Sequence, residues 1–375
     1  IEGLTGKKEF SEINQAINTV TSSIQINQPV APRSKFKKQP NVLLTGASGF
    51  LGIYLLAELQ NRAGEIICLA RGKSDQQITD NLKKQAEHSN LEIDFNQIRV
   101  IRGDLSEKEL GLSAYKYNQL TNVVDQIIHC GAWINHLYSY SSLRSANVGS
   151  TVELIKLALA GKYRTPLCFI STESAATNLQ GISCVEEAIL DPVKNQPISD
   201  NGYMLSKWVS ELILANAVHN QGLDCLIARP GNITGDSRTG FSNYRNNHFW
   251  MYTKGCLQMG IAPLIQQHVE MTPVDILARA IVALVFDAQE GLRVANLSNP
   301  INIPWEQFFK AITQITGQEV AMVEAKSWQT KLKEINTENT LYMLRDLYSE
   351  DITAASPVVN RSSSQAVLNS LGVSI

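Results

Sequence analysis

The chain has 375 residues, of which 44% are hydrophobic and 18% are charged, and its formal net charge is −2. These values are ordinary for a globular protein with a sizeable core, and the length favours two domains or one large domain with an elaboration. The balanced charge excludes the basic surface typical of nucleic-acid-binding proteins. The longest apolar stretch, residues 280–286, is too short to cross a bilayer. We therefore expect a cytoplasmic protein.

The cysteines and histidines give no sign of a metal centre. Six cysteines are scattered along the chain without a C-x-x-C pair, and several lie in apolar runs. This usage favours reduced, buried thiols over a disulfide framework or a zinc site. His129 and His136 have no companions at metal-ligand spacing, so we interpret both as structural residues and predict no metal site.

Residues 1–40 show no sustained apolar period and end in a basic run at residues 33–38. They predict a linker, with one short helix between residues 10 and 20. The chain begins with Ile rather than Met, which suits a fragment of a longer protein and equally a cleavage remnant followed by a flexible tail.

From residue 41 onward, short apolar runs alternate with helical patterns. This rhythm predicts an α/β fold of the Rossmann type, a doubly wound parallel sheet of about seven strands. Ligands of such sheets bind beyond the carboxyl ends of the strands. The seven expected strands are 41–45, 65–70, 97–102, 124–129, 166–171, 223–228 and 293–297.

A glycine loop follows the first expected strand and precedes a helical pattern. Gly46, Gly49 and Gly52 form G-x-x-G-x-x-G, in which small residues permit a tight turn and let the backbone approach a pyrophosphate at a helix N-terminus. A lone pattern of this kind is often only a turn, but its place between strand and helix favours nucleotide binding. The expected contacts are Thr45, Gly46, Ser48, Gly49, Phe50, Leu51 and Gly52.

The ends of the next strands suggest how the rest of a dinucleotide binds. Arg71 stands where an acidic residue would hold a ribose 2′-hydroxyl, so NADP is favoured, although an exposed strand-end arginine is the alternative. Asp104 and Leu105 suit the adenine, and Gly131 and Ala132 let the backbone pass close to the cofactor. Both of these segments are equally compatible with simple strand-end turns.

A second segment contains the candidate catalytic residues. Tyr203 and Lys207 lie four residues apart on one helical face, where the lysine charge would bring the tyrosine pKa closer to working pH. Thr172, at the end of the fifth strand, could hydrogen-bond the same substrate oxygen, although a capping role is the commoner use of such a threonine. Ser171 and the segment 229–232 follow the fifth and sixth strands, so both should face the same crevice.

Two segments interrupt the alternation of expected strands and helices. Residues 236–270 and 301–375 follow neither the strand nor the helix alternation of the sheet region. We expect them to form a smaller, mostly helical substrate domain, and residues 41–235 with 271–300 to form the Rossmann domain.

These residues resemble the extended short-chain dehydrogenase/reductase superfamily and, within it, the thioester reductase (terminal reductase) domains of nonribosomal peptide synthetases and polyketide synthases. Related reductase domains occur in carboxylic acid reductases. The resemblance covers about residues 41–300. The strings that carry it are residues 68–71, 131–136, 146–151, 202–211, 229–235 and 271–275.

The resemblance implies NADPH-dependent reductive release of an acyl or peptidyl chain from a phosphopantetheine thioester. Tyr203 would donate the proton, Thr172 would share that hydrogen bond, and Lys207 would tune the phenol and hold the ribose. The product would be an aldehyde, with an alcohol after a second round, and the partner would be an acyl or peptidyl carrier protein beside a monomeric domain of a larger synthetase. Residues 1–40 would then lie next to the carrier. Further cofactor contacts implied are Lys83, Asn147, Ser171, Pro230, Gly231, Asn232 and Ile233.

Two departures and three alternatives stay open. The second arginine that commonly clamps the 2′-phosphate is matched here by Asn81, which leaves Arg71 and a lysine such as Lys83 for that role. Ser139 replaces the family's usual proline. A fatty acyl-CoA reductase would share the whole site. An NAD-dependent nucleotide-sugar epimerase or dehydratase would need an acidic residue near Arg71, and a non-catalytic NADP-sensing module would not need Tyr203 and Lys207.

Overall fold

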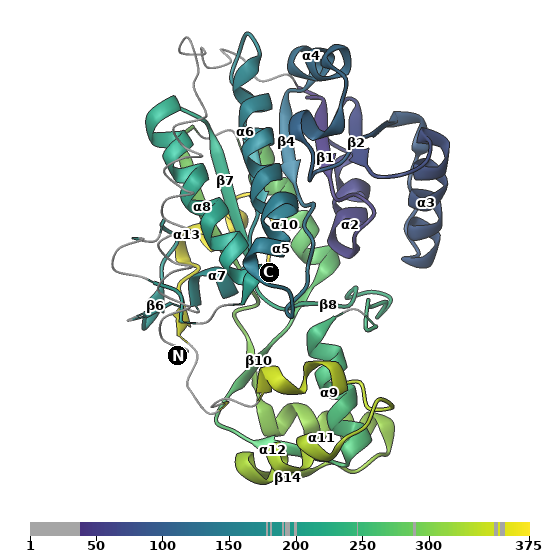
Figure 1. The fold of residues 1–375 in the computed structure, drawn as a ribbon, viewed down its shortest axis with the longest axis vertical. Coiled ribbons are helices and arrows are strands. Elements are labelled where there is room, and N and C mark those ends of the chain that lie inside the picture. Colours follow the sequence, from purple (N-terminus) through teal and green to yellow (C-terminus); the bar gives the residue numbers. More distant parts are fainter. Residues whose placement is uncertain are drawn as a thin grey trace.

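The computed structural model describes residues 38–177, 179–180, 182–189, 191, 196–198, 201–245, 247–287, 290–348, 352 and 357–375. Nearly all of the expected linker, residues 1–40, lies outside this part of the chain. The described residues form a large upper unit built on one sheet and a smaller lower unit rich in helices (Figure 1). None of the described helices combines the length and apolarity that a membrane span requires.

A seven-stranded parallel sheet forms the centre of the upper unit, as the alternation of apolar runs predicts. Its strand order is β12-β7-β5-β4-β1-β2-β3, so the connection reverses direction between β1 and β4. A switch of this kind opens a crevice at the carboxyl edge of the sheet. The strands are β1 (Val42–Thr45), β2 (Ile66–Ala70), β3 (Ile98–Arg102), β4 (Gln126–His129), β5 (Leu167–Ile170), β7 (Cys225–Pro230) and β12 (Leu292–Leu297).

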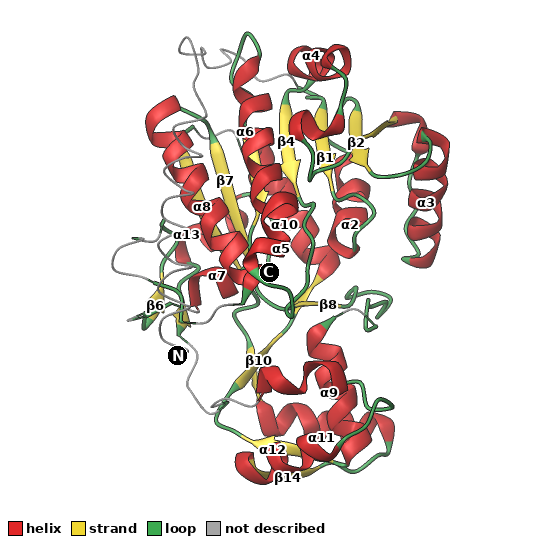
Figure 2. Cartoon of the chain, in the orientation of Figure 1, coloured by secondary structure: helices red, strands yellow, loops and turns green. Residues whose placement is uncertain are grey.

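Helices cover both faces of this sheet because alternate strand residues point to opposite sides. Leu43 contributes to a core shared with α4, α6 and α8, whereas Val42 and Leu44 contribute to a second core with α2, α3, α10 and α13. Figure 2 shows these helices in red flanking the yellow strands. They are α2 (Phe50–Leu59), α3 (Asp75–His88), α4 (Ala114–Val123), α6 (Ser150–Ala160), α8 (Gly202–Gln221), α10 (Val274–Phe286) and α13 (Ser362–Ser370).

The lower unit has an aromatic core of its own. Tyr252, Trp305 and Trp328 pack together, with the Tyr252 ring centroid 5.4 Å from that of Trp305 and 5.5 Å from that of Trp328. The strands β9 and β14 pair in parallel, and β10 and β13 pair antiparallel. Its elements are α9 (His248–Met259), β9 (Ile261–Leu264), β10 (His268–Glu270), β13 (Asn302–Pro304), α11 (Trp305–Thr316), β14 (Ala321–Glu324), α12 (Ala325–Glu334) and the 3₁₀ segment η4 (Tyr342–Tyr348).

Short elements complete the upper unit and connect its strands to the crevice. A π-helical turn, η3, joins α5 to α6, and two-residue bridges pair β8 with β11 and β6 with β15. These elements are η1 (Phe95–Gln97), η2 (Lys108–Gly111), α5 (Tyr140–Arg144), η3 (Ser145–Gly149), α7 (Ser174–Thr177), β6 (Cys184–Val185), β8 (Ile233–Thr234), β11 (Thr272–Pro273) and β15 (Val358–Val359).

The C-terminal segment departs from the expected domain division. Sequence reasoning assigned residues 301–375 wholly to the substrate domain, but residues 357–375 pack on the large unit. The strand β15 pairs with β6, and Leu368 and Val373 are buried in the core beside α10. Leu368 lies on α13 and Val373 follows it, and α13 packs on α10 and on β12, the edge strand of the sheet.

Candidate active site

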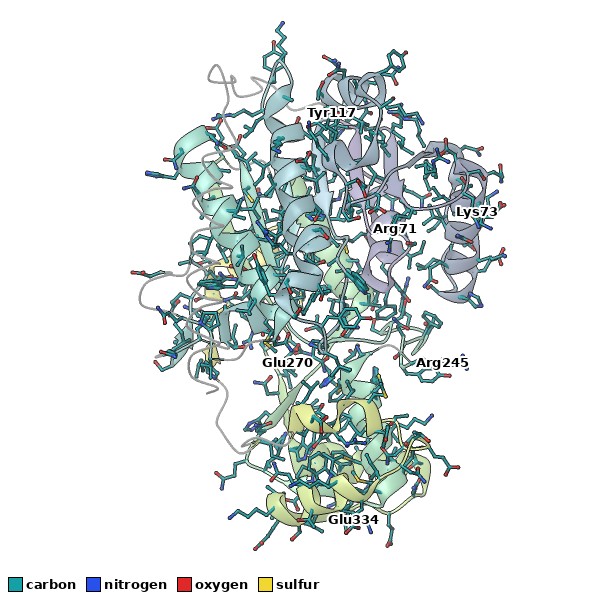
Figure 3. All side chains as sticks on the ribbon, viewed as in Figure 1. Arg71, Lys73, Tyr117, Arg245, Glu270 and Glu334 are labelled. Atoms are coloured by element: carbon teal, nitrogen blue, oxygen red, sulfur yellow. The ribbon has the colours of Figure 1, made fainter. Side chains whose placement is uncertain are left out.

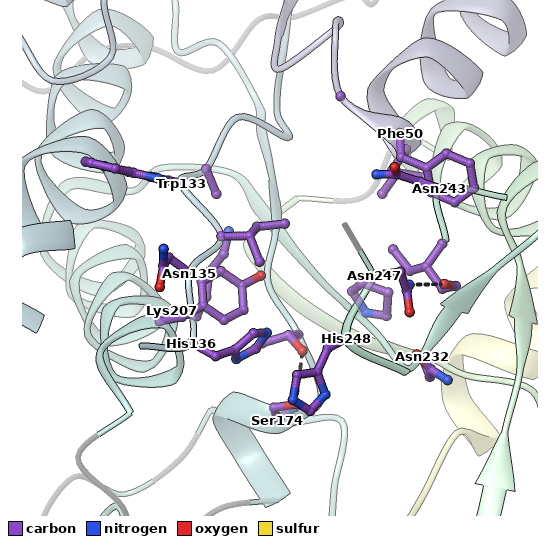
Figure 4. Close-up of a pocket in the computed structure, with 18 of the residues that line it drawn as sticks. Phe50, Trp133, Asn135, His136, Ser174, Lys207, Asn232, Asn243, Asn247 and His248 are labelled. Carbon is purple, nitrogen blue, oxygen red and sulfur yellow. Dashed lines mark hydrogen bonds between the residues drawn. The ribbon is translucent and has the colours of Figure 1, made fainter. Parts of the chain in front are cut away.

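A cavity of about 1700 Å³ lies between the carboxyl edge of the sheet and the lower unit. Figure 4 shows side chains from both units around it, with Phe50 and Asn243 on one side and Trp133 and Asn135 on the other. Its lining includes the glycine loop, the ends of β2, β4, β5 and β7, and parts of α8, α9 and η4. The topological switch point thus opens onto a single continuous space.

The glycine loop has the geometry that close approach of a ligand requires. Gly46 has φ +76°, and a Cβ there would stand 2.5 Å from the backbone nitrogen of Gly131. A Cβ on Gly52 would overlap the carbonyl oxygen of Gly46, so only glycine lets α2 begin this close to β1. No side chain caps the N-terminus of α2, and Phe50, Leu51 and Gly52 of its first turn line the cavity, so the N–H groups of this turn could bind an anion there. These residues fit a dinucleotide pyrophosphate.

Thr45 supports this loop from behind instead of lining the cavity. It is fully buried, its Oγ1 lies 2.8 Å from His129 Nδ1, and the same oxygen accepts a hydrogen bond from the Gly131 N–H at 3.1 Å. Burial and the charge of Lys207 lower the pKa of His129 to about 3, so the imidazole is neutral. The interpretation of His129 as a structural residue agrees with these contacts.

Arg71, which Figure 3 labels on the upper unit, lines the cavity just after β2, as does Asp104 after β3. Although burial opposes it, hydrogen bonds from Ser106 and the charge of Arg71 lower the pKa of Asp104, which is therefore ionised. Lys83 does not line the cavity. Lys83 lies on α3, with its ammonium 5.6 Å from the centroid of the Phe95 ring of η1, so this structure gives no contact that supports its expected role beside Arg71.

Tyr203 and Lys207 occupy the first two turns of α8 and both line the cavity. Burial raises the pKa of Tyr203, so its phenol is protonated and can serve as a proton donor. Burial thus moves this pKa in the direction opposite to the one expected from Lys207. The Lys207 ammonium donates a hydrogen bond to the Ile170 carbonyl at 2.6 Å and lies 4.5 Å from the Phe169 ring centroid. Burial lowers the pKa of Lys207 to about 8.

Thr172 stands at the carboxyl end of β5 and faces the same space as Tyr203 and Lys207. Its Oγ1 accepts a hydrogen bond from the Ser174 N–H at 3.3 Å, which is the capping contact considered as the alternative role. The hydroxyl hydrogen remains available for a substrate oxygen, because that backbone bond uses only an acceptor site of the oxygen. Both roles are therefore compatible with this geometry.

Asn147 is buried in the π-helical turn and organises the neighbouring segments. Its amide accepts a hydrogen bond from the Trp133 N–H at 2.7 Å, and its Nδ2 donates to the Trp133 carbonyl at 3.1 Å and to Ser206 Oγ at 2.9 Å. Ser206 Oγ in turn donates to the Tyr203 carbonyl at 2.7 Å. Asn147 thus holds the loop after β4 against the start of α8 and does not line the cavity.

A buried ion pair anchors α8 to the sheet. Arg229 Nη2 lies 2.5 Å from Glu211 Oε2, and Ser171 Oγ donates to Glu211 Oε1 at 2.5 Å. Arg229 also donates hydrogen bonds to the backbone carbonyls of Glu186 and Ala188, so its guanidinium is bound to protein groups on several sides. This network fixes the α8 helix that carries Tyr203 relative to the strand ends, which explains why arginine and glutamate occur at fully buried positions.

The structure adds residues that sequence reasoning missed. The His136 ring centroid lies 5.4 Å from that of Tyr203 and 5.2 Å from that of His248, whose imidazole is 3.0 Å from the Tyr348 hydroxyl. Glu173 and Glu270 also line the cavity, beside Gly231. Sequence reasoning interpreted His136 as a structural residue, although it lies in the string 131–136 that carries the resemblance. No local motif marks Glu173, His248, Glu270 and Tyr348, which come from loops and from the lower unit and meet only in the folded chain.

Most of the expected site residues share this one cavity. Those that line it are Gly46, Ser48, Gly49, Phe50, Leu51, Gly52, Arg71, Asp104, Leu105, Gly131, Ala132, Ser171, Thr172, Tyr203, Lys207, Pro230, Gly231, Asn232 and Ile233. Thr45 and Asn147 support it from behind, and Lys83 lies outside. Among the described residues, no group of three or more His, Cys, Asp and Glu side chains is placed to hold a metal ion.

The sheet order, the glycine loop and the Tyr203/Lys207 pair together define a dinucleotide-binding protein of the short-chain dehydrogenase/reductase type. Residues 44–281 match the NAD-binding family described as male sterility protein, and the chain belongs to this family. The resemblance to terminal reductase domains is also confirmed. The structure is similar to the terminal R domain of the myxalamid PKS-NRPS biosynthetic pathway, with a TM-score of 0.86, 29% identity and coverage of 96% of this chain and 92% of that one.

Two curated relatives place this similarity within larger proteins. The chain is 32% identical over 306 residues to L-2-aminoadipate reductase of Schizosaccharomyces pombe, which covers 78% of this chain and 21% of that protein. It is 31% identical over 337 residues to a linear gramicidin synthase polypeptide of Brevibacillus parabrevis, which covers 88% of this chain and 6% of that polypeptide. The chain therefore spans a quarter or less of the length of these relatives.

Proposed function

We propose that the chain catalyses the NADPH-dependent reductive release of an acyl or peptidyl thioester, carried on a phosphopantetheine arm, as an aldehyde. The observation that supports this most strongly is the shared cavity. It joins a glycine loop suited to a pyrophosphate, a protonated tyrosine and a space that continues into the lower unit, where the acyl chain would lie. The relatives, which include an aminoadipate reductase and a gramicidin synthase, support the same reaction.

When bound, the nicotinamide supplies a hydride. The chain's own residues position the thioester and move the proton. The Tyr203 phenol donates its proton to the carbonyl oxygen as negative charge develops there, and the Thr172 hydroxyl shares that hydrogen bond. The resulting hemithioacetal collapses when the Tyr203 phenolate takes the hydroxyl proton back and the C–S bond breaks. The aldehyde is released, and pantetheine leaves as a thiolate that takes a proton from water. A second round would yield an alcohol.

The cofactor is proposed to be NADPH because Arg71 stands at the end of β2, where the 2′-phosphate of the adenosine ribose would lie. A guanidinium can bind a phosphate with two parallel hydrogen bonds. Lys207, which is partly cationic near pH 8, would hold the nicotinamide ribose and stabilise the phenolate left after proton transfer. Pro230 ends β7, Gly231 and Asn232 follow it, and these residues would contact the nicotinamide ring.

The partner is proposed to be an acyl or peptidyl carrier protein in a larger synthetase, with this domain acting as a monomer in the cytoplasm. The test is to mix the purified chain with NADPH and an acyl-pantetheine thioester and to follow loss of NADPH absorbance together with aldehyde formation. We expect turnover with the thioester and none with a nucleotide sugar. Turnover on a nucleotide sugar without turnover on any thioester would contradict the proposal.

A further inference from the structure

Exposed apolar side chains gather on the wall of the cavity that lies beyond Tyr203. Trp133, Ile134 and Leu137, from the loop after β4, are 49%, 63% and 48% exposed, and Met343 of η4 is 68% exposed. All four line the cavity, as does Leu347 one turn further along η4. Large apolar groups left open to water on facing elements usually mark a place where an apolar ligand binds. We call this set, Trp133, Ile134, Leu137, Met343 and Leu347, the apolar wall.

The apolar wall is continuous with the reacting end. The His136 ring packs edge-on against Tyr203, the His248 ring follows at 5.2 Å, and Tyr348 stacks on His248 with a centroid distance of 5.6 Å. Tyr348 belongs to η4, the element that carries Met343 and Leu347. A group attached to a carbonyl at Tyr203 can therefore extend along these rings to the apolar wall without crossing a barrier of charged side chains.

The two imidazoles along this path are uncharged at neutral pH. Burial lowers the pKa of His136, and burial and the proximity of His136 lower that of His248 to about 4, so both imidazoles are neutral. Arg345 and Asp346, the charged residues of η4, line a separate hollow on its other side. Of the charged residues that line the main cavity, Glu270 already accepts hydrogen bonds from the backbone of Asn232 and Asn299.

Arg245 is a cation that also lines the cavity. Its Nε donates to the Tyr244 hydroxyl at 3.1 Å. It belongs to the segment after Phe241, whose ring lies 6.3 Å from that of Phe50 in the glycine loop. Figure 4 shows Asn243 of this segment beside Phe50, across the space from Trp133. These contacts join Arg245 to Tyr244 and its segment to the glycine loop, and they do not join it to the apolar wall.

From this placement we propose that the acyl group released by this chain is apolar and uncharged, and that the apolar wall discriminates against acyl groups bearing a carboxylate. The proposal rests on the proposed function and narrows its substrate class. A carboxylate seated against these side chains would lose water without gaining a charged partner, which is unfavourable. The aminoadipyl group named by one relative would be a poor substrate for this reason.

The test compares two pantetheine thioesters of equal chain length, a decanoyl thioester and the monothioester of decanedioic acid. We expect kcat/KM for the decanoyl thioester to be at least about tenfold higher, a ratio within the range that pocket contacts deliver. Met343→Lys should lower this ratio at least about fivefold, because the introduced ammonium would pair with the distal carboxylate. Leu347→Lys serves as a second variant should the first fail to fold, as judged by circular dichroism.

The matched control is Ile315→Lys. Ile315 is 81% exposed on α11 and does not line the cavity, so the same change of charge there should leave the ratio as it is. A wild-type ratio near one, or equal effects of lysine at positions 343 and 315, would overturn the proposed substrate class while the reductase function stands. Failure to reduce either thioester would instead overturn the proposed function, and this inference with it.

Discussion

Arg71 is the side chain that we propose selects between the two nicotinamide cofactors. It lines the cavity at the end of β2 beside an ionised Asp104. Arg71→Asp should lower the NADPH-to-NADH ratio of kcat/KM at least about tenfold, because it replaces a phosphate-binding cation with a group that repels phosphate and can hold a ribose hydroxyl. Steady-state kinetics with both cofactors measures this ratio.

Lys83 supplies the comparison for that experiment. Lys83 lies on α3 with its ammonium over the Phe95 ring, and it does not line the cavity. Lys83→Asp should therefore leave the NADPH-to-NADH ratio of kcat/KM unchanged. A ratio that responds to position 83 but not to position 71 would show that the 2′-phosphate is held by the helix after β2 and that the role proposed for Arg71 is wrong.

Glu173 follows Thr172 and is held in an environment that favours its neutral form. Burial, with a smaller contribution from the charge of Glu270, raises the pKa of Glu173 to about 7. The hydrogen bond from Ser298 and the charges of Arg361 and Arg229 act in the opposite direction but are outweighed. The unfolded chain releases this proton near its ordinary pKa of about 4.5, so the native state binds the proton more tightly. The stability that this proton contributes is fully present below about pH 4.5 and is lost as pH rises through about 7.

Glu173→Gln should remove this pH dependence, because glutamine keeps a neutral, hydrogen-bonding side chain at all pH values. We expect the free energy of unfolding of the native sequence to fall by up to about 3 kcal/mol more between about pH 4.5 and 8 than that of the variant. Urea unfolding at several pH values measures it, with exposed Glu306→Gln as the control. Parallel curves for native sequence and Glu173→Gln would contradict the raised pKa.

At the scale of elements, the packing at the start of α2 depends closely on which residue occupies position 52. A Cβ at Gly52 would overlap the Gly46 carbonyl, whereas a Cβ at Gly149 would meet only the Arg144 carbonyl at 3.8 Å. Gly52→Ala should therefore destabilise the fold by about 2 kcal/mol or more and weaken NADPH binding, since the loop must shift. Gly149 has φ −57°, so Gly149→Ala should be neutral or stabilising.

Urea unfolding and fluorescence titration with NADPH measure both effects for this pair of glycine variants. Unaltered stability and binding in Gly52→Ala would mean that α2 does not pack on the loop as the structure has it. A large loss in Gly149→Ala would mean that the π-helical turn, rather than the glycine loop, limits stability in this region.

The seven strands were predictable because strands buried on both faces of a parallel sheet appear as continuous apolar runs. The run Val42–Leu44 and the run Ile66–Leu69 are examples, and both are fully or almost fully buried. The two-residue pairs β6/β15 and β8/β11 were not predictable, since such short segments carry no period and form only where tertiary contacts bring them together. The π-helical turn around Asn147 likewise depends on its hydrogen bonds to Trp133 and Ser206.

At the scale of the whole molecule, the site divides into a half that local sequence predicts and a half that it does not. The cofactor half follows from motifs at strand ends, such as Gly46 and Arg71, because topology brings those ends to one edge. The other half joins His136 and Trp133 of one unit to His248 and Met343 of the other. No spacing in the chain links residues 136 and 248, so their proximity emerges only from the folded structure.

The two units meet around Tyr203, and this arrangement is the basis of the proposed chemistry. The glycine loop and Arg71 would place the cofactor, α8 presents the phenol, and the lower unit would enclose the acyl group. Tyr203→Phe should slow reduction at least about a hundredfold, because it removes the proton donor, while NADPH binding stays close to that of the native sequence. Residual turnover close to the native rate would remove Tyr203 from the acid role.

The most direct test of the central claim is a single-turnover reaction with NADPH carrying deuterium at the transferred position and an acyl-pantetheine thioester. We expect one equivalent of free thiol and an aldehyde that carries one deuterium at its carbonyl carbon, formed by the native sequence and scarcely by Tyr203→Phe. Release of the acyl group without deuterium, or no reaction of the thioester while NADPH is bound, would contradict it.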